Sequence, residues 1–546
     1  MPIKSSMIEE VVPNVDAWEY FMESPRNYPD DQTLYLDGET GRSYTFAQTK
    51  SLAADFGKGL KHKLKWQKGD VMGLYTPNHI DVPPVTFGIL WAGGIMSPAN
   101  PTYTPGELAN QLRDSGARAL VTQKPFLPAA LEAAAQVGMP AESVFLLGDG
   151  RDESGKHAHW SDINARDAWL QPGRTKVDVK KDLAYLVYSS GTTGLPKGVM
   201  LSHENIVANS VQSSRLDIKS MNWDIDTQLG VLPFFHIYGL AIVLGNTIKS
   251  GVRCVIMAKF DLEKACKLIQ DYRITFMYVP PPIVLALGKH PIVDKYDLSS
   301  LRWINSAAAP LSRELVVSVW ERLKVGVKQG YGLSETSPVA TMQFVDEWWK
   351  NQGSVGRLVP NMEAMIVGED GKEAPTGESG ELYLKGPNIF KGYWKKPDLD
   401  KENFTEDGWY KTGDVFYVTK DGQFYITDRI KELIKYKGFQ VPPAELEAKI
   451  IGRKDVADVC VIGVWDKEQH TEVPRAYIVL TAGEEPSEAK AKEITAWLDE
   501  RVAPPKKLRG GVRFIKEVPK SQAGKILRRV LRDQAKKEDA GPQAKL

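Results

Sequence analysis

The sequence predicts an α/β fold with a large N-terminal domain, made of two α/β subdomains and a small β subdomain, and a small α+β C-terminal domain. Three observations lead to this prediction. Strand and helix signals alternate over residues 34–123 and 182–332, short strands separated by turns follow over 354–427, and a lysine-rich mixture of strands and helices begins near residue 429. At roughly 100–200 residues per domain, a chain of 546 residues is too long for one compact core.

Residues 34–123 alternate between strand-like and helix-like stretches, and we expect them to form the first pair of α/β layers. The second begins near residue 182, where the apolar run 184–188 is typical of a strand buried on both faces. After a loop rich in Gly, Ser and Thr, Ser202 is expected to cap a helix that carries Glu204 in its first turn.

Beyond this helix the alternation continues as far as Gly332. Strands are expected at 252–257, 274–280, 301–307 and 325–332, and helices at 261–272 and 312–323. This order predicts parallel strands joined by crossover helices.

The pattern changes after residue 354. Turns at 368–371 and 421–422 separate runs of alternating apolar residues, which predicts a small β subdomain. The last stretch has strand signals at 459–464 and 476–480 and a helix signal at 490–502. We therefore predict an N-terminal domain over residues 1–428 and a C-terminal domain over residues 429–546.

The composition is that of an ordinary globular protein. Hydrophobic residues make up 42% and charged residues 25%, and the net charge of +1 gives no reason to expect nucleic acid or an anionic membrane as a partner. Cys254, Cys266 and Cys460 lack the spacing of a zinc site or a disulfide framework, and we expect buried thiols in a reducing compartment.

The ends of the chain bear on its location. The first residues lack the apolar core of a secretory signal, and no stretch approaches about 18 uninterrupted apolar residues, so we expect no transmembrane helix. The sequence ends in Ala544-Lys545-Leu546, a variant of the Ser-Lys-Leu peroxisomal signal. We therefore expect a peroxisomal protein with the import receptor as a partner.

A loop of hydroxyl residues and glycines follows the buried strand. It consists of Ser189, Ser190, Gly191, Thr192, Thr193, Gly194, Leu195, Pro196, Lys197 and Gly198. Glycines let backbone N–H groups turn toward a polyanion, hydroxyls add donors, and Lys197 adds a positive charge. An ordinary turn between two elements rarely needs this combination, so the loop predicts phosphate binding.

The loop differs from the Walker pattern. Counted from Gly191, Pro196 takes the place of the second glycine, and Gly198 takes the place of the hydroxyl residue that normally holds magnesium. The metal must therefore be held elsewhere, which argues against an ordinary NTPase or kinase.

Residues 188–203, YSSGTTGLPKGVMLSH, resemble the signature of the adenylate-forming superfamily, which includes acyl-CoA synthetases, 4-coumarate–CoA ligases, luciferases and the adenylation domains of peptide synthetases. Further motifs occur in the family's order: LPFFHIYGL at 232–240, NSAAAP at 305–310, QGYGLSET at 329–336, GWYKTGDV at 408–415, DRIKELIKYKGFQVPPAELEA at 428–448 and PKSQAGKILRR at 519–529. The resemblance covers nearly the whole chain and is closest to the 4-coumarate–CoA ligase and luciferase branch.

This resemblance implies an ATP-dependent, AMP-forming acid–thiol ligase with ATP, Mg²⁺ and coenzyme A as cofactors. It assigns Glu335 to the metal, Ser334 to the α-phosphate, Tyr331 to adenine, and Asp414 with Arg429 to ribose. The implied nucleotide-binding set also contains Ser189, Ser190, Gly191, Thr192, Thr193, Gly194, Lys197, Ala307, Ala308, Ala309, Gln329, Gly330 and Gly332.

The resemblance also assigns roles in the C-terminal domain, which it implies to be mobile. Lys525 is expected to contact the carboxylate and the α-phosphate during adenylation, and Lys435 to serve thioester formation. Lys431 takes the hinge position, so that rotation of the domain presents first Lys525 and then the Lys435 face. The remaining assignments are Gln440 near the nucleotide, and Gly438 and Phe439 along the pantetheine arm.

The acid pocket implied by the resemblance is mostly apolar, which favours an acid with an apolar or aromatic tail. Its lining is expected to be His236, Ile237, Tyr238, Gly239, Asn305, Ala307, Ala308, Gly332, Pro338 and Val339. His236 is also a candidate catalytic residue. Plant 4-coumarate enzymes often carry glycines near Ala307 and Ala308 and a lysine near Asn305, so an aryl acid with a smaller or unhydroxylated ring, or a medium-chain fatty acid, fits as well as 4-coumarate.

Two alternatives share the adenylation chemistry. A luciferase-like monooxygenase would use the same site and the same peroxisomal address. An adenylation enzyme that loads a carrier protein would need that partner in trans, because no carrier-like tail follows Arg529.

Overall fold

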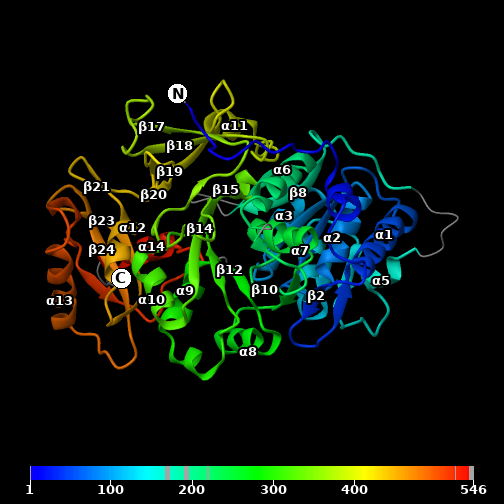
Figure 1. Ribbon diagram of the computed structural model, residues 1–546, viewed down its shortest axis with the longest axis horizontal. Helices are drawn as coiled ribbons and strands as arrows, with labels where there is room; N and C mark the ends of the chain where they lie inside the picture. The colour runs from blue at the N-terminus through cyan, green and yellow to red at the C-terminus, as the bar shows by residue number, and fades with distance from the viewer. Residues whose placement is uncertain (1, 166–172, 190–195, 218–219, 523, 540–546) are drawn as a thin grey trace, which may run out of the picture.

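The computed structural model describes residues 2–165, 173–189, 196–217, 220–522 and 524–539. Two large sheets, a smaller antiparallel sheet and a C-terminal unit make up the molecule (Figure 1). The predicted α/β class, with its large N-terminal part and small C-terminal part, is confirmed. The predicted boundary between residues 428 and 429 stays a prediction.

A six-stranded sheet holds the strand before the phosphate loop. Its order is β7 (Val144–Leu147), β6 (Ala117–Gln123), β4 (Val71–Tyr75), β5 (Ile95–Ala99), β8 (Leu183–Ser189) and β9 (Lys197–Ser202). All neighbours are parallel except β8 and β9, which pair antiparallel and place Ser189 opposite Lys197. The chain therefore returns along β8 before the next helix, and this extra strand was absent from the prediction.

The helices around this sheet are α1 (Phe46–Lys63), α2 (Val82–Trp91), α3 (Pro105–Ser115), α4 (Leu127–Gln136), α5 (Trp160–Ile163) and α6 (His203–Ser214). Helix α6 begins as predicted, because the Ser202 side chain accepts a hydrogen bond from the Asn205 backbone N–H.

The second large sheet has nine strands. Its order is β16 (Arg357–Leu358), β15 (Val339–Met342), β14 (Gly326–Gly332), β13 (Trp303–Ser306), β12 (Phe276–Val279), β10 (Thr227–Gly230), β11 (Arg253–Ile256), β2 (Thr33–Asp37) and β3 (Ser43–Thr45). The strands from β14 to β2 in this order run parallel, as the alternation predicted. Strand β2 joins this sheet beside β11, although its place in the sequence suggested the first layer pair.

The helices of this part are a π-helix at Tyr238–Gly245, α7 (Asn246–Ser250), α8 (Leu262–Tyr272), α9 (Pro281–Lys289) and α10 (Arg313–Leu323). Helices α9 and α10 face the C-terminal unit, and their buried side chains share one apolar cluster with it (Figure 1).

The predicted β subdomain is an antiparallel five-stranded sheet of β1 (Ile3–Lys4), β17 (Glu363–Val367), β18 (Gly380–Lys385), β19 (Tyr410–Val418) and β20 (Phe424–Arg429), with α11 (Pro397–Asn403) in the connection between β18 and β19. Strand β1 comes from the start of the chain and pairs with β17, more than 350 residues away in the sequence.

The C-terminal unit is α+β, as predicted. Its strands are β21 (Ile434–Tyr436) and β22 (Phe439–Val441) in a hairpin, and β23 (Val456–Asp466), β24 (Thr471–Leu480) and β25 (Val512–Phe514) in a three-stranded sheet. Its helices are α12 (Pro443–Ile451), α13 (Glu488–Asp499) and α14 (Arg528–Asp539).

The three cysteines are buried free thiols, which agrees with the sequence expectation. Within the described ranges, the structure contains no helix with the length and apolar character needed to cross a bilayer.

Candidate active site

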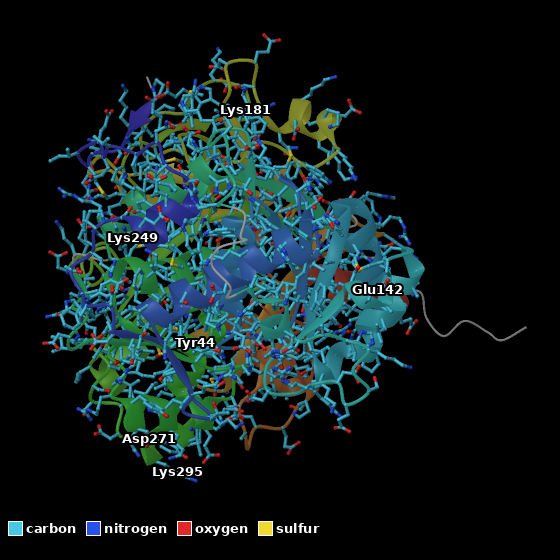
Figure 2. All side chains as sticks on the ribbon, turned by 90° about the vertical axis from the view of Figure 1, so that its right-hand side faces the viewer. Tyr44, Glu142, Lys181, Lys249, Asp271 and Lys295 are labelled. Atoms are coloured by element: carbon cyan, nitrogen blue, oxygen red, sulfur yellow. The ribbon has the colours of Figure 1, made fainter. Side chains whose placement is uncertain are left out.

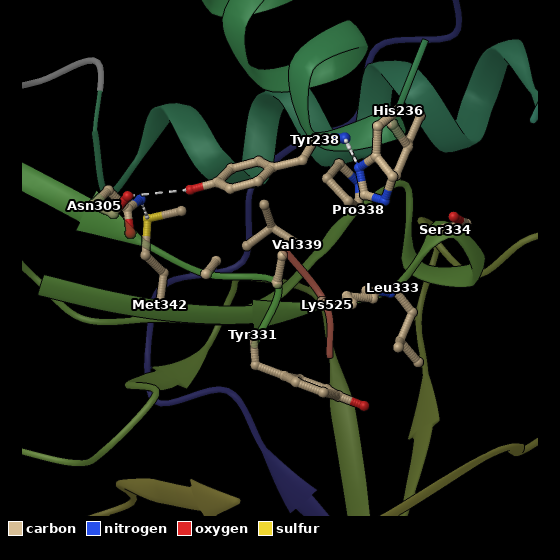
Figure 3. Close-up of a pocket in the computed structure, with 15 residues that line it drawn as sticks. His236, Tyr238, Asn305, Tyr331, Leu333, Ser334, Pro338, Val339, Met342 and Lys525 are labelled. Atoms are coloured by element: carbon tan, nitrogen blue, oxygen red, sulfur yellow. Dashed lines mark hydrogen bonds between the residues drawn. The ribbon is translucent and has the colours of Figure 1, made fainter. Parts of the chain in front are cut away.

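A mostly apolar cavity lies at the carboxyl ends of the parallel strands β13 and β14, the usual position of ligand sites in open α/β sheets (Figure 3). It encloses about 470 Å³ of space between atoms, including solvent space at its mouth. Its lining consists of His236, Ile237, Tyr238, Asn305, Ala307, Ala308, Gly330, Tyr331, Gly332, Leu333, Ser334, Pro338, Val339, Met342 and Lys525.

The structure brings together nearly all of the predicted acid pocket. Nine of the ten residues line the cavity, and Gly239 is not among the described lining residues. Gly239 packs on the backbone of Pro233, where an added Cβ would come within 2.2 Å of the Pro233 carbonyl oxygen. Asn305 is buried at one end of the cavity, beside Tyr238, whose hydroxyl lies 3.4 Å from the Asn305 carbonyl oxygen (Figure 3).

Leu333 and Met342 also line the cavity and were missed by sequence reasoning. Leu333 lies within the motif that was assigned to the nucleotide, and it was therefore not considered for the acid pocket. Met342 arrives because β15 returns antiparallel beside β14, a pairing that local periodicity does not reveal.

Lys525 enters the cavity from the C-terminal unit, on the loop between β25 and α14 (Figure 3). The preceding Gly524 has φ +79°, and a Cβ there would come within 2.8 Å of the Pro280 Cβ, so glycine permits this close approach. Burial, followed by the nearby Arg429 guanidinium, lowers the pKa of Lys525 to about 8. At neutral pH the side chain is still mostly a cation.

His236 lines the same cavity. Burial and then the charge of Lys525 lower the pKa of His236 to about 3, so its ring is neutral at physiological pH. Its Nδ1 accepts a hydrogen bond of 3.3 Å from the Tyr238 backbone N–H, which leaves the ring proton on Nε2. The ring therefore offers the cavity a neutral donor rather than a charge.

The expected ribose residues lie together around the buried Asp414 carboxylate. Asp414 on β19 stands directly opposite Arg429 on β20, and the Arg429 Nε lies 3.0 Å from the Asp414 Oδ1. The Tyr331 hydroxyl donates to the Asp414 Oδ2 at 2.6 Å. The carboxylate raises the pKa of Arg429 above its usual range, while burial and then Asp414 raise that of Tyr331. Asp414 can still accept ribose hydroxyls, since an ionised carboxylate has about four lone-pair sites.

The expected metal residue lies close to the end of the phosphate loop. The Oε1 of buried Glu335 accepts a hydrogen bond of 2.9 Å from the Tyr393 hydroxyl, and the Lys197 Nζ lies 5.1 Å from the centre of the Tyr393 ring. Tyr393 thus connects the two. Sequence reasoning missed it because it lies in none of the recognised motifs.

Some of the other expected nucleotide residues are described by the structure, and the rest lie outside the described residues. Ser189 ends β8, Gln329 exchanges hydrogen bonds with Gln343 on the strand pair β14–β15, and Ala309 follows the cavity residues Ala307 and Ala308. Ser190, Gly191, Thr192, Thr193 and Gly194 lie outside the described residues.

The second predicted set is not brought to the cavity in this structure. Lys435, Gly438, Phe439 and Gln440 are exposed on the β21–β22 hairpin, and Phe439 is 59% exposed. Gln440 bonds to the Glu369 side chain instead. Lys431 is exposed in the turn that follows β20.

Comparisons with known proteins identify the family of this chain. The family model described as "AMP-binding enzyme" matches residues 21–394, and the model "AMP-binding enzyme C-terminal domain" matches residues 445–525. The chain is 39% identical over 542 residues to "Probable 4-coumarate–CoA ligase 1" of Dictyostelium discoideum, covering 96% of both chains. It is 39% identical over 510 residues to "4-coumarate–CoA ligase" of Pinus taeda, covering 92% of both chains.

Solved structures are similar over the same length. The anthranilate CoA ligase AuaEII in complex with anthranoyl-AMP has a TM-score of 0.86 at 26% identity, covering 96% of this chain and 98% of that one. ATP-bound MatB from Rhodopseudomonas palustris has a TM-score of 0.83 at 27% identity, with coverages of 96% and 99%. The resemblance found in the sequence motifs is confirmed, and the chain belongs to the AMP-binding enzyme family.

Proposed function

We propose that this chain is an ATP-dependent, AMP-forming acid–thiol ligase that activates an aryl or medium-chain carboxylic acid and transfers the acyl group to coenzyme A. One observation carries the proposal: the Lys525 cation lies in the apolar cavity whose walls hold both the expected acid residues and the expected nucleotide residues Tyr331 and Ser334. An acid and the α-phosphate of ATP would therefore meet beside the Lys525 ammonium group.

In the first step a carboxylate oxygen attacks the α-phosphorus of ATP, the bond to the β-phosphate breaks, and pyrophosphate leaves. Two anions approach each other, so a fixed positive charge at the reaction centre lowers the barrier. Lys525 supplies that charge, Lys197 stands at the end of the loop expected to hold the departing phosphates, and neutral His236 adds no charge to the acid pocket.

The expected Mg²⁺ fits Glu335. Magnesium in nucleotide sites is commonly held by one or two carboxylates together with the substrate phosphates. Among the described residues, no group of three or more His, Cys, Asp or Glu side chains could hold a metal ion. Buried Glu335 lies near Lys197, at the end of the phosphate loop. Glu335 and the substrate phosphates would therefore hold the ion together. When bound, the ion would offset the charge that develops on the leaving phosphates.

The second step needs a different part of the chain. A free carboxylate resists thiol attack, whereas an acyl-adenylate has AMP as a leaving group. A thiol with a pKa of about 8.5 needs only partial ionisation to attack it. The exposed hairpin with Lys435, Gly438 and Phe439 is the surface we propose for this step, after rotation about Lys431.

The acid is proposed to be an aryl acid with a small or unhydroxylated ring, or a medium-chain fatty acid. Ala307 and Ala308 narrow the cavity, while Met342, Val339 and Pro338 give it apolar walls. Asn305 is the polar side chain at the far end, where a lysine is common in plant 4-coumarate enzymes.

Pyrophosphate release tests the proposal. Purified protein, ATP and Mg²⁺ should release pyrophosphate with some members of a panel of benzoates, cinnamates and fatty acids of graded length, and coenzyme A should convert the adenylate to a thioester. Release with no member of the panel would remove the proposed function. Light on addition of luciferin in air would favour the monooxygenase, and adenylate formation without transfer to free coenzyme A would favour a carrier protein.

We also propose that the C-terminal Ala544-Lys545-Leu546, which lies outside the described residues, addresses the protein to peroxisomes. A fluorescent protein fused ahead of the chain should collect in peroxisomes, and deletion of the three residues should abolish that pattern. An unchanged distribution after the deletion would contradict the proposal.

A further inference from the structure

Helix α9 ends in a lysine that contacts the backbone of the C-terminal unit. The Lys289 Nζ donates to the carbonyl oxygens of Ile451 at 2.9 Å, Val456 at 3.0 Å and Arg453 at 3.4 Å. These three carbonyls surround the end of α12 and the turn into β23. One side chain of the N-terminal part therefore binds three backbone groups of the C-terminal unit.

The end of α12 has a physical need for such a partner. The last carbonyl groups of a helix lack intrahelical donors, and the helix dipole favours a cation at this end. An ammonium group has three donors and a flexible stem, which suits three converging carbonyls. Burial lowers the pKa of Lys289, while Asp455 and Asp458 act in the opposite direction.

The other end of α9 contacts the loop that carries Lys525. Pro280 and Pro282 lie so close to Gly524 that an added Cβ would come within 2.8 Å of the Pro280 Cβ and 3.3 Å of the Pro282 Cδ. Between these two ends, Val284 and Leu287 of α9 belong to the same buried apolar cluster as the side chains of α12. Helix α9 is therefore one of the surfaces against which the C-terminal unit is held.

Helix α12 also follows the exposed hairpin directly in the chain. Strand β22 ends at Val441, and α12 begins two residues later at Pro443. Fixing α12 against α9 therefore keeps Lys435 and Phe439 at the surface while Lys525 occupies the cavity. A rotation that brings the hairpin to the cavity must move α12 and so break the Lys289 contacts.

We propose that Lys289 is a positioning residue that holds the C-terminal unit in the arrangement for acyl-adenylate formation and releases it for thioester formation. The proposal rests on the proposed function, because it assigns one half-reaction to this arrangement. It predicts that loss of the Lys289 donors weakens the first half-reaction selectively.

The test variant is Lys289→Met, which keeps most of the length of the side chain and removes its charge and donors. Pyrophosphate release in the first turnover, without coenzyme A, should fall by about tenfold to a hundredfold, the range expected for lost charge-assisted hydrogen bonds. Thioester formation from supplied acyl-adenylate and coenzyme A should stay unchanged or become faster. An unchanged first half-reaction, or an equal loss in both, would overturn the proposal.

Two further variants separate positioning from general damage. Lys289→Arg keeps the charge and the donors and should retain more adenylation than the methionine variant. Lys295→Met removes an exposed lysine at the edge of the molecule, six residues along the chain, and should match the wild type in both half-reactions (Figure 2). If the arginine variant loses as much adenylation as the methionine variant while Lys295→Met loses none, a need for close packing replaces the proposed capping role.

The wild-type protein separates failure of this inference from failure of the proposed function. If it releases no pyrophosphate with any acid in the panel, the function itself is wrong. If it does, and Lys289→Met releases pyrophosphate equally fast, only the positioning role is wrong.

Discussion

Two lysines of the C-terminal unit stand in opposite surroundings. Lys525 lies inside the cavity, where burial lowers its pKa to about 8. Lys435 is exposed on the β21–β22 hairpin. The family resemblance assigns a half-reaction to each of them, yet only one faces the cavity.

The exposed hairpin is firmly attached to the rest of the C-terminal unit through its backbone. The Lys435 backbone N–H donates to the Glu472 carboxylate at 2.9 Å, and its carbonyl accepts from the Thr471 hydroxyl at 2.8 Å, which attaches the hairpin to β24. Both lysines therefore belong to one packed unit, which has to turn as a whole before the second can replace the first. The difference between the two regions indicates reagents used in sequence, and the following predictions test that interpretation.

The largest effect is expected at Lys525. Lys525→Ala removes the positive charge at the point where two anions meet, and adenylate formation should fall by about a hundredfold to a thousandfold. Thioester formation from supplied acyl-adenylate should persist. Separate assays of the two half-reactions provide the measurement, and an equal loss in both would break the division between the two lysines.

The reverse bias is expected at Lys435. Lys435→Ala changes an exposed side chain far from the cavity, so pyrophosphate release without coenzyme A should remain near the wild-type rate. Transfer from supplied acyl-adenylate to coenzyme A should slow by about tenfold or more. A variant that transfers the acyl group normally would leave the exposed hairpin without a role in the second step.

The pH dependence of the two half-reactions should also differ. The pKa of Lys525 is lowered to about 8, so the ammonium loses its proton, and its charge, as pH rises through that value. The kcat/KM for adenylation should therefore fall by about tenfold for each pH unit above 8. Thioester formation should rise over the same range, because a larger fraction of the coenzyme A thiol is ionised to the nucleophilic thiolate as pH rises. Parallel pH profiles would contradict the assignment.

The smallest effect is expected in the acid pocket. Ala308 has φ +76°, a conformation that favours glycine, so Ala308→Gly should relieve backbone strain and widen the cavity. The free energy of unfolding should change by less than about 1 kcal/mol, since relief of strain is offset by the flexibility of glycine in the unfolded chain. The kcat/KM for bulkier acids relative to small ones should rise by up to about tenfold.

A neighbouring alanine provides the control. Ala309 stands outside the set of described residues that line the cavity, so Ala309→Gly should leave the preference among acids of graded size as in the wild type. The same shift in both variants would assign the change to loop flexibility and not to the missing methyl group of Ala308.

Local patterns predicted several of the elements closely. The helices α8 and α10 and the strands β11 to β14 formed within a few residues of the expected ranges, because periodicity and capping act over short distances. The pairing of β1 with β17 and of β2 with β11 was not predictable, since it depends on partners far along the chain. Strand β9 was not predicted, because its first residues, Lys197 and Gly198, were assigned to the phosphate loop.

The site divides in the same way. Motifs predicted Tyr331, Asp414 and Lys525, and the structure places all three at or beside the cavity. Tyr393 and Met342 were not predicted. Each reaches the site through the packing of one strand or loop on another, and neither belongs to a motif.

By itself, the sequence determined the chemical groups available to this protein: a phosphate loop, the carboxylates of Glu335 and Asp414, and two lysines on one small domain. Only the tertiary structure decided that Lys525 occupies the cavity while Lys435 faces solvent. The physical reason is that this choice depends on contacts between distant residues. Those of Lys289 with Ile451 and of Gly524 with Pro280 join segments more than 150 residues apart, beyond the reach of any local pattern.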